Sequence, residues 1–153
     1  MNVEEIFRTY GDMLYRIALV MLKNVQDAED VVSDTLVKYM INKKEFKDDE
    51  HRKAWLIRVD INLCKNKLLF RARHPGITLE ELNLPQSDER SELLQLLMNL
   101  PRNYREVLLL YYVQGYKIVE IADILRIGEG AVKKRLERGR KKLKELVERD
   151  GGF

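Results

Sequence analysis

The chain has 153 residues and 45% apolar content, enough for one ordinary domain or for two small domains with a core in each. Its single cysteine, Cys64, excludes an internal disulfide, the apolar runs are too short to span a bilayer, and no secretory signal opens the sequence, so we expect a cytoplasmic protein without direct membrane insertion. The net charge of +3 hides basic blocks at residues 51–75 and 101–150, with acidic blocks before and between them, which indicates two contacts with a polyanion.

Apolar residues at helical spacing predict a first helix over residues 3–23, and Asn24 and Val25 break it. Asp27 is then predicted to be the N-cap of a second helix, because aspartate is favoured at that position. The core face of that helix is expected to contain Val31, Val32, Leu36, Tyr39 and Met40. This leaves Asp30, Ser33 and Asp34 pointing outward. Charge alone leaves two interpretations of the acidic turn equally open, helix capping and an acidic surface for a basic protein partner.

A polar loop over residues 42–50 contains one large apolar residue, Phe46, and a third helix is predicted over residues 51–71. Its core stripe is expected to contain Trp55, Leu56, Val59, Leu63 and Leu68. Its cationic face contains Arg52, Lys53, Arg58, Lys65, Lys67 and Arg71, with Asn62 among them. Asn62 is either a solvated amide or a donor and acceptor for a base edge. His51 and His74 have no second ligand at metal-binding spacing, so no metal site is expected.

The Arg73-His74-Pro75-Gly76 stretch stops the third helix, because proline excludes the helical conformation before it and glycine tolerates a turn. We therefore predict a first domain over residues 1–72, a linker over residues 73–90 and a second domain over residues 91–153. Limited proteolysis is expected to cut first in the linker. A helix restarts at residues 91–98, and Pro101 precedes the helix that contains Tyr104, Val107, Leu108, Tyr111 and Tyr112.

The apolar spacing over residues 115–146 predicts two helices across a short turn, with a first stripe of Ile118, Ile121, Ala122 and Leu125. The second helix begins near Glu129 and is strongly basic. Its cations are Lys133, Lys134, Arg135, Arg138, Arg140, Lys141, Lys142 and Lys144. Such a helix fits the DNA major groove, and we favour nucleic acid over a merely solvated face because the charge and the bihelical pattern coincide.

Several short motifs occur in one order along the chain: DAEDVV at residues 27–32, Phe46 nine residues before Trp55 and Leu56, Asn62, then LP at 100–101, REVL at 105–108, EIA at 120–122 and GAVKKRL at 130–136. Together they resemble the extracytoplasmic-function (ECF) group of bacterial RNA polymerase sigma factors, in the sigma-70 family. The resemblance covers nearly the whole chain. It implies an all-α fold of two small helical domains, called regions two and four, joined by a flexible linker.

The resemblance also implies partners and roles. Asp30, Ser33 and Asp34 would bind the clamp helices of the largest subunit of core RNA polymerase. Phe46, Lys47, Asn62 and Lys65 would capture and line the non-template strand of the minus-ten element. Lys133, Lys134, Arg135, Arg138 and Lys141 would read the promoter DNA of the minus-thirty-five element as duplex, while the domain leans on the polymerase flap. An anti-sigma factor is a further expected partner, and no cofactor is expected.

Four positions depart from the usual pattern of the family. Arg126 stands where glycine is common in the turn, and Gly139 replaces a usual alanine in the basic helix. A left-handed arginine costs about 1 to 2 kcal/mol and a glycine inside a helix about 1 kcal/mol. Ser33 replaces a common glutamine and Lys134 a common serine, which bears on polymerase affinity and promoter sequence.

Two other classes of function are weighed against the sigma factor. A stand-alone repressor or activator could use the same carboxy-terminal helices, but its first domain would have no reason to present a second basic face with Asn62. An enzyme is disfavoured, because the sequence has no glycine-rich phosphate loop, no paired ligand motif and no nucleophile with a base nearby.

Overall fold

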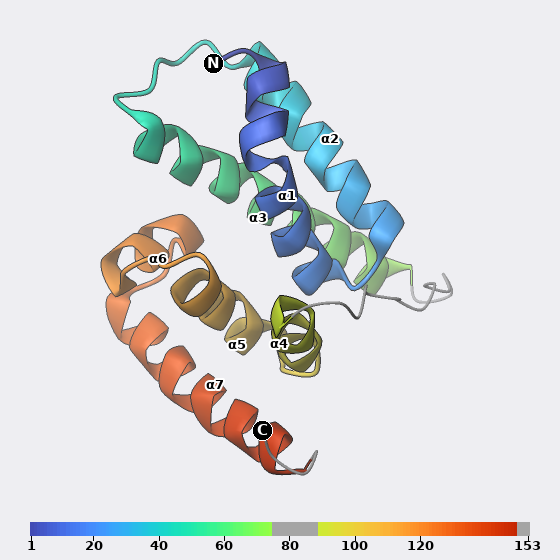
Figure 1. Ribbon diagram of the computed structural model, residues 1–153, viewed down its shortest axis with the longest axis vertical. Coiled ribbons are helices and arrows are strands. Elements are labelled where there is room, and N and C mark those ends of the chain that lie inside the picture. The colour runs from blue at the N-terminus through green and yellow to red at the C-terminus, as the bar shows by residue number, and fades with distance from the viewer. Residues whose placement is uncertain (75–88, 150–153) are drawn as a thin grey trace. The chain divides into compact units, whose positions relative to one another are not determined.

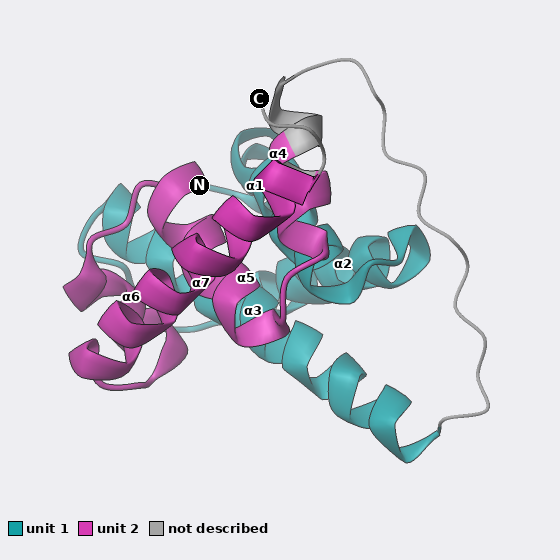
Figure 2. Ribbon diagram, turned by 90° about the horizontal axis from the view of Figure 1, so that it is seen from below, with its two compact units in different colours: residues 1–82 teal, residues 83–153 magenta. Residues whose placement is uncertain are grey.

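The computed structural model describes residues 1–74 and 89–149, and helices are the only regular elements in these two stretches. The helices are α1 (Val3–Leu22), α2 (Val25–Ile41), α3 (Asp49–Arg73), α4 (Glu89–Met98), α5 (Arg102–Leu108), the π-helical turn η1 (Leu109–Val113), α6 (Ile118–Leu125) and α7 (Glu129–Arg149) (Figure 1). The all-α prediction is confirmed. The chain divides into two compact units, residues 1–82 and 83–153 (Figure 2). Most of the expected linker, residues 75–88, lies outside the described residues.

The turn between α1 and α2 differs from the sequence prediction. Lys23 adopts the left-handed conformation (φ 54°), and its amide donates to the Leu19 carbonyl at 2.8 Å, which closes α1. Asn24 then lies extended, so its side-chain oxygen accepts from the Asp27 amide at 2.8 Å. The N-cap of α2 is therefore Asn24, and the expectation of Asp27 was wrong. Asp27 is the third residue of α2, in its first turn, and its carboxylate contacts Arg71 of α3.

In the first unit, α1, α2 and α3 pack against one another around a core that includes Ile6, Leu14 and Leu56. The buried face of α3 contains Leu56, Ile57, Asp60, Ile61 and Cys64. This stripe is rotated by about one residue from the predicted one, because Asp60 interrupts the apolar pattern in the sequence.

Two large apolar residues of the first unit lie on its surface, and one of them, Met40, was expected in its core. Met40 is 64% exposed and Phe7 is 58% exposed. Met40 comes near the end of α2 and lines a surface cavity described below. Phe7 lies beside Gly11, where an added Cβ would come within 3.1 Å of the Phe7 ring. The ring therefore covers the backbone of its own helix from the outside.

The second unit contains the predicted helix-turn-helix, formed by α6 and α7. Ile121, Ala122 and Leu125 are buried, and α7 begins at Glu129 as expected. Arg126 adopts the left-handed conformation (φ 57°, ψ 48°), and the Ile127 amide donates to the Ala122 carbonyl at 3.0 Å. The turn thus keeps the geometry that favours glycine, although an arginine stands there.

The helix predicted through Tyr112 is not uniform. The α-helical hydrogen bonds of α5 end at Leu108 and the chain continues as η1, in which the Gln114 amide donates to the Leu109 carbonyl at 3.0 Å. Helix α7 packs against α5, and Gly139 of α7 is buried at this contact. A Cβ at Gly139 would lie 3.1 Å from Leu108 Cδ1 and from Tyr104 Cβ. The glycine therefore permits close approach of the two helices, which offsets its cost in helix propensity.

Candidate nucleic-acid and protein-binding surfaces

An acidic surface lies on α2. Asp30, Ser33 and Asp34 are exposed on consecutive turns, as the sequence predicts. Asp27 is half-buried and its Oδ2 accepts from Arg71 Nη2 at 2.6 Å, while Arg71 Nη1 donates to the Leu22 carbonyl at 2.7 Å. Arg71 therefore joins the end of α1 and the start of α2 to α3. Asp27 is part of the fold, and the other three side chains are available to a partner.

The exposed acidic residue Asp30 already has a neighbouring cation on α3. Lys67 Nζ lies 3.7 Å from Asp30 Oδ2 and 3.9 Å from Asp27 Oδ1. At these distances and with half of the Asp30 side chain in water, the ion pair is weak. A basic partner can displace Lys67 from Asp30 at small cost.

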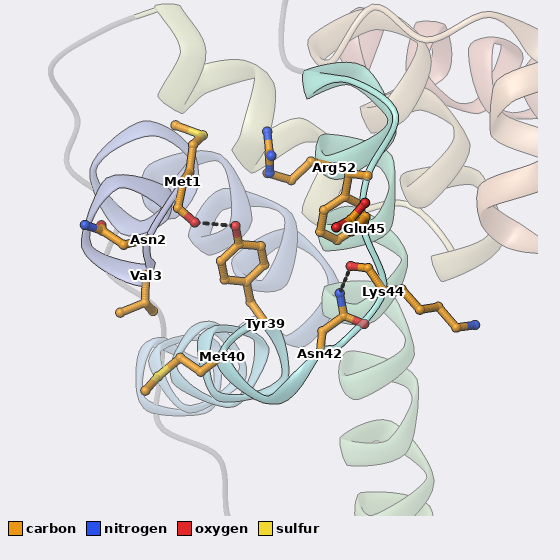
Figure 3. Close-up of a pocket in the computed structure, with 10 residues that line it drawn as sticks. Met1, Asn2, Val3, Tyr39, Met40, Asn42, Lys44, Glu45 and Arg52 are labelled. Atoms are coloured by element: carbon orange, nitrogen blue, oxygen red, sulfur yellow. Dashed lines mark hydrogen bonds between the residues drawn. The ribbon is translucent and has the colours of Figure 1, made fainter.

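A cavity of about 590 Å³ opens on the surface of the first unit (Figure 3). Figure 3 shows that the start of α1, the end of α2, the α2–α3 loop (residues 42–48) and the start of α3 surround it. Tyr39 Oη donates to the Met1 carbonyl at 2.6 Å, and Asn42 Nδ2 donates to the Lys44 carbonyl at 2.9 Å. The cavity is lined by Met1, Asn2, Val3, Tyr39, Met40, Asn42, Lys44, Glu45, Phe46 and Arg52.

Phe46, a predicted base-capturing residue, is half-buried in one wall of this cavity. Its ring stacks parallel to that of Tyr39, with centroids 6.2 Å apart, and meets the edge of Trp55 at 5.6 Å. The Arg52 guanidinium lies 5.4 Å from the Phe46 centroid. Phe46 is thus held as a fixed aromatic surface, next to apolar and polar side chains that could surround a flat ring.

The other predicted minus-ten residues do not share that cavity. Lys47 is exposed in the α2–α3 loop, whereas Asn62 is exposed and Lys65 half-exposed on the later turns of α3. Asn62 lies thirteen residues beyond Asp49, the first residue of α3, which corresponds to about 20 Å along the helix axis. Asn62 and Lys65 thus lie on α3 and Lys47 lies in the loop before it, so the predicted minus-ten residues do not form a single site.

The basic helix α7 presents Lys133, Lys134, Arg138 and Lys141 to solvent. Arg135 differs, because its side chain is only 28% exposed and its Nη1 lies 3.7 Å from Oε1 of the buried Glu106 on α5. Arg140 Nη1 donates to Tyr112 Oη at 3.1 Å. Four of the five predicted duplex-binding cations are therefore exposed on one helix, and Arg135 would reach DNA only by leaving Glu106.

The contact with Glu106 predicts a structural effect of Arg135. Arg135→Ala removes a cation beside a buried carboxylate, so it should destabilise the second unit by about 1 to 3 kcal/mol. The matched control is Arg138→Ala, an exposed cation three residues later in the same helix, which should change stability by less than about 0.5 kcal/mol. Thermal unfolding followed by far-UV circular dichroism compares the two variants. Equal stability of the two variants would contradict a structural role for Arg135.

An apolar groove of about 600 Å³ in the second unit was not predicted from the sequence. It lies between α4, the end of α5, η1 and the later turns of α7. The lining residues are Leu93, Leu97, Leu108, Tyr112, Val113, Arg140, Leu143, Lys144, Val147 and Glu148. The signal that could have found it is Leu143 and Val147, which extend the apolar stripe of α7 beyond the turns that pack on α6. The groove suits an apolar helix or loop of a protein partner.

None of the helices in the two described stretches is long and apolar enough to cross a membrane. Comparison with protein families matches residues 6–74 to Sigma-70 region 2 and residues 90–143 to Sigma-70, region 4. The chain is 32% identical to the ECF RNA polymerase sigma factor SigM of Bacillus subtilis (strain 168), over 97% of each protein. It is 29% identical to the ECF RNA polymerase sigma factor SigM of Mycobacterium tuberculosis (strain H37Rv), over 94% of this chain and 76% of that protein.

Two solved structures share the fold. The sigma factor RpoE of Bartonella quintana, in complex with the anti-sigma factor NepR, matches with a TM-score of 0.81 and 25% identity, over 95% of this chain and 96% of that one. CnrH, in complex with the cytosolic domain of CnrY, matches with a TM-score of 0.71 and 27% identity, over 97% and 88% of the two chains.

Proposed function

Because this chain belongs to the ECF group of the sigma-70 family and is a transcription initiation factor, we propose that it binds core RNA polymerase and reads two promoter elements in two different forms. The second unit binds the minus-thirty-five element as duplex, and the first unit captures unpaired bases of the minus-ten element. The single observation that carries this proposal is the difference between the two basic surfaces. One is a helix of exposed cations, and the other combines an aromatic cavity with polar and cationic residues in the α2–α3 loop and on α3.

The shape of α7 supports duplex binding. An α-helix fits the major groove, where residues of its first turns reach base edges and later cations neutralise phosphates. Lys133 and Lys134 lie in the first turns, and Arg138 and Lys141 follow. We propose that the apolar groove between α4 and α7 receives the polymerase flap, because a protein contact there leaves these four cations free for DNA.

The aromatic wall of the cavity supports single-strand capture. An unpaired base has a flat face that stacks on an aromatic ring regardless of sequence. Phe46 offers such a ring, and Arg52 and Asn42 supply hydrogen-bond donors at the cavity. Beyond the cavity, the unpaired DNA strand would pass Lys47 in the loop and then Asn62 and Lys65 on α3. Capture of an extruded base replaces part of the stacking that the base loses, so the duplex can be melted without ATP.

The acidic surface supports polymerase binding. Asp30, Ser33 and Asp34 present oxygen atoms to a basic partner, and we propose that this partner is the clamp of the largest polymerase subunit. The related RpoE was solved in complex with an anti-sigma factor. By analogy we propose that an anti-sigma factor also controls this chain, by covering surfaces that polymerase would use.

The test separates melting from duplex binding. Phe46→Ala should leave the affinity for closed promoter duplex nearly unchanged and reduce open-complex formation by holoenzyme about tenfold, since a base–aromatic stack is worth about 1 to 3 kcal/mol. Asn62→Ala should change both measurements in the same direction as Phe46→Ala, through the loss of a polar contact with the unpaired strand. Permanganate reactivity of promoter thymines measures melting, and a gel shift measures duplex affinity. The opposite pattern is expected for Lys134→Ala, which should weaken duplex binding. If the Phe46 and Asn62 variants melt the promoter normally, the stand-alone regulator becomes the better explanation.

A further inference from the structure

His51 makes two hydrogen bonds at the start of α3 that no sequence motif predicts. Its amide donates to Asp48 Oδ1 at 2.8 Å, so Asp48 is the N-cap of α3. Its ring Nδ1 accepts from the Lys47 amide at 3.1 Å. A backbone N–H can only donate, so Nδ1 carries the lone pair and the ring proton is on Nε2.

This arrangement is a variant of the capping box. In the usual capping box the third helical residue is Glu or Gln, and its side chain accepts from the amide of the N-cap residue. Here the third residue is His51, and its ring accepts one residue further back, at Lys47. The α2–α3 loop is therefore tied to α3 at the residue that follows Phe46.

The tie holds one side of the aromatic wall. Tyr39 and Trp55 contact the Phe46 ring from α2 and α3, and the His51 ring meets it edge-on, with centroids 5.4 Å apart. The backbone beside Phe46 would otherwise be a loop with few hydrogen bonds of its own. With the Lys47 amide bound, both the ring and the backbone that carries it have fixed positions relative to α3.

We propose that His51 is a positioning residue for base capture: by accepting from the Lys47 amide, it pre-organises the α2–α3 loop so that Phe46 already stands in its capturing position before DNA arrives. The inference rests on the proposed function of the cavity. A loop ordered in the free protein loses less conformational entropy when the base binds, and this raises the affinity for the unpaired strand without a direct contact from His51.

Two variants separate the hydrogen bond from the ring contact. His51→Asn keeps an acceptor, because Oδ1 is the same number of bonds from the backbone as Nδ1, but it removes the ring. His51→Phe keeps an edge against Phe46 and removes the acceptor. In the full chain, amide hydrogen exchange at Lys47 should become about three- to tenfold faster in His51→Phe and stay near the native rate in His51→Asn. Equal exchange rates at Lys47 in the two variants would show that the His51 acceptor does not hold the Lys47 amide.

Holoenzymes with the same variants then test the effect on melting. Open-complex formation, measured by permanganate reactivity, should fall about three- to tenfold with His51→Phe and be restored with His51→Asn, while duplex affinity stays constant in both. If Phe46→Ala lowers melting but His51→Phe does not, the positioning role is overturned and base capture stands. If Phe46→Ala also melts normally, base capture itself fails, and the positioning role falls with it.

Discussion

Replacing both Asp30 and Asp34 by arginine should abolish retention of the chain on core RNA polymerase, with a loss of about 2 to 5 kcal/mol in binding free energy. Both side chains are exposed on α2, so the substitution places two cations where we propose that a basic partner meets two carboxylates. The variant loses the attraction of the two carboxylates for the partner. It also gains repulsion between like charges, which weakens binding further. Folding should be nearly unaffected, because within the described residues these two carboxylates make one weak ion pair, between Asp30 and Lys67.

The matched control for this charge reversal is Asp12→Arg on α1. Asp12 is also an exposed carboxylate of the first unit, and it loses one ion pair, with Arg16 at 3.1 Å. This variant should bind core polymerase within about twofold of the native chain, since exposed pairs of this kind contribute little. Retention of the double variant on immobilised core enzyme at the native level would rule out α2 as the polymerase surface.

Sequence patterns located the helix-turn-helix and the basic helix because the apolar and charged residues there repeat without interruption. The buried face of α3 was misplaced because Asp60 stands in the middle of it, and a pattern counts a carboxylate as a surface residue. The N-cap of α2 was misplaced because the left-handed turn at Lys23 decides which polar residue meets the free amides. Residue propensities do not predict that turn, since lysine rarely adopts the left-handed conformation.

The candidate sites were predictable where one helix carries them and unpredictable where several elements meet. Lys133, Lys134, Arg138 and Lys141 follow from the order of residues on α7. The cavity does not, because it joins Met1 to Tyr39 and the α2–α3 loop, which are far apart in sequence. The direction of the Arg135 side chain does not follow from the order of residues either, since Glu106 attracts it from another helix. A pattern gives the face of a residue on its own helix, and its partners come from the packing.

Substitution of the buried Asp60 is the second change for which we expect a large effect, here on the stability of the first unit. Its side chain is fully buried on α3, and neither oxygen has a hydrogen-bond partner of ordinary geometry within the described residues. The neighbouring Thr35 hydroxyl donates instead to the Val31 carbonyl at 2.8 Å. Burial raises the pKa of Asp60 well above its ordinary value of 3.8, and a contribution from Thr35 lowers it without cancelling that effect. The charged form is therefore unfavourable in the folded chain.

Asp60→Asn should accordingly stabilise the first unit by about 1 to 3 kcal/mol near pH 7.5, because the amide has nearly the same shape and no charge to bury. The sign with pH follows from the raised pKa. Above the ordinary aspartate pKa the unfolded chain releases its proton first, so native stability falls as the pH rises toward the folded pKa. The gain from the substitution should therefore shrink toward pH 4, where the folded chain keeps Asp60 protonated and the unfolded chain begins to protonate it as well.

Urea unfolding followed by Trp55 fluorescence measures this effect, because Trp55 is the only tryptophan and lies on the same helix as Asp60. Asp34→Asn, an exposed carboxylate changed in the same way, should give no comparable gain at either pH. A gain from Asp60→Asn that persists unchanged at pH 4 would mean that its origin is packing and not charge. A loss at pH 7.5 would mean that the Asp60 carboxylate is stabilised inside the bundle, against the unpartnered geometry of its two oxygens.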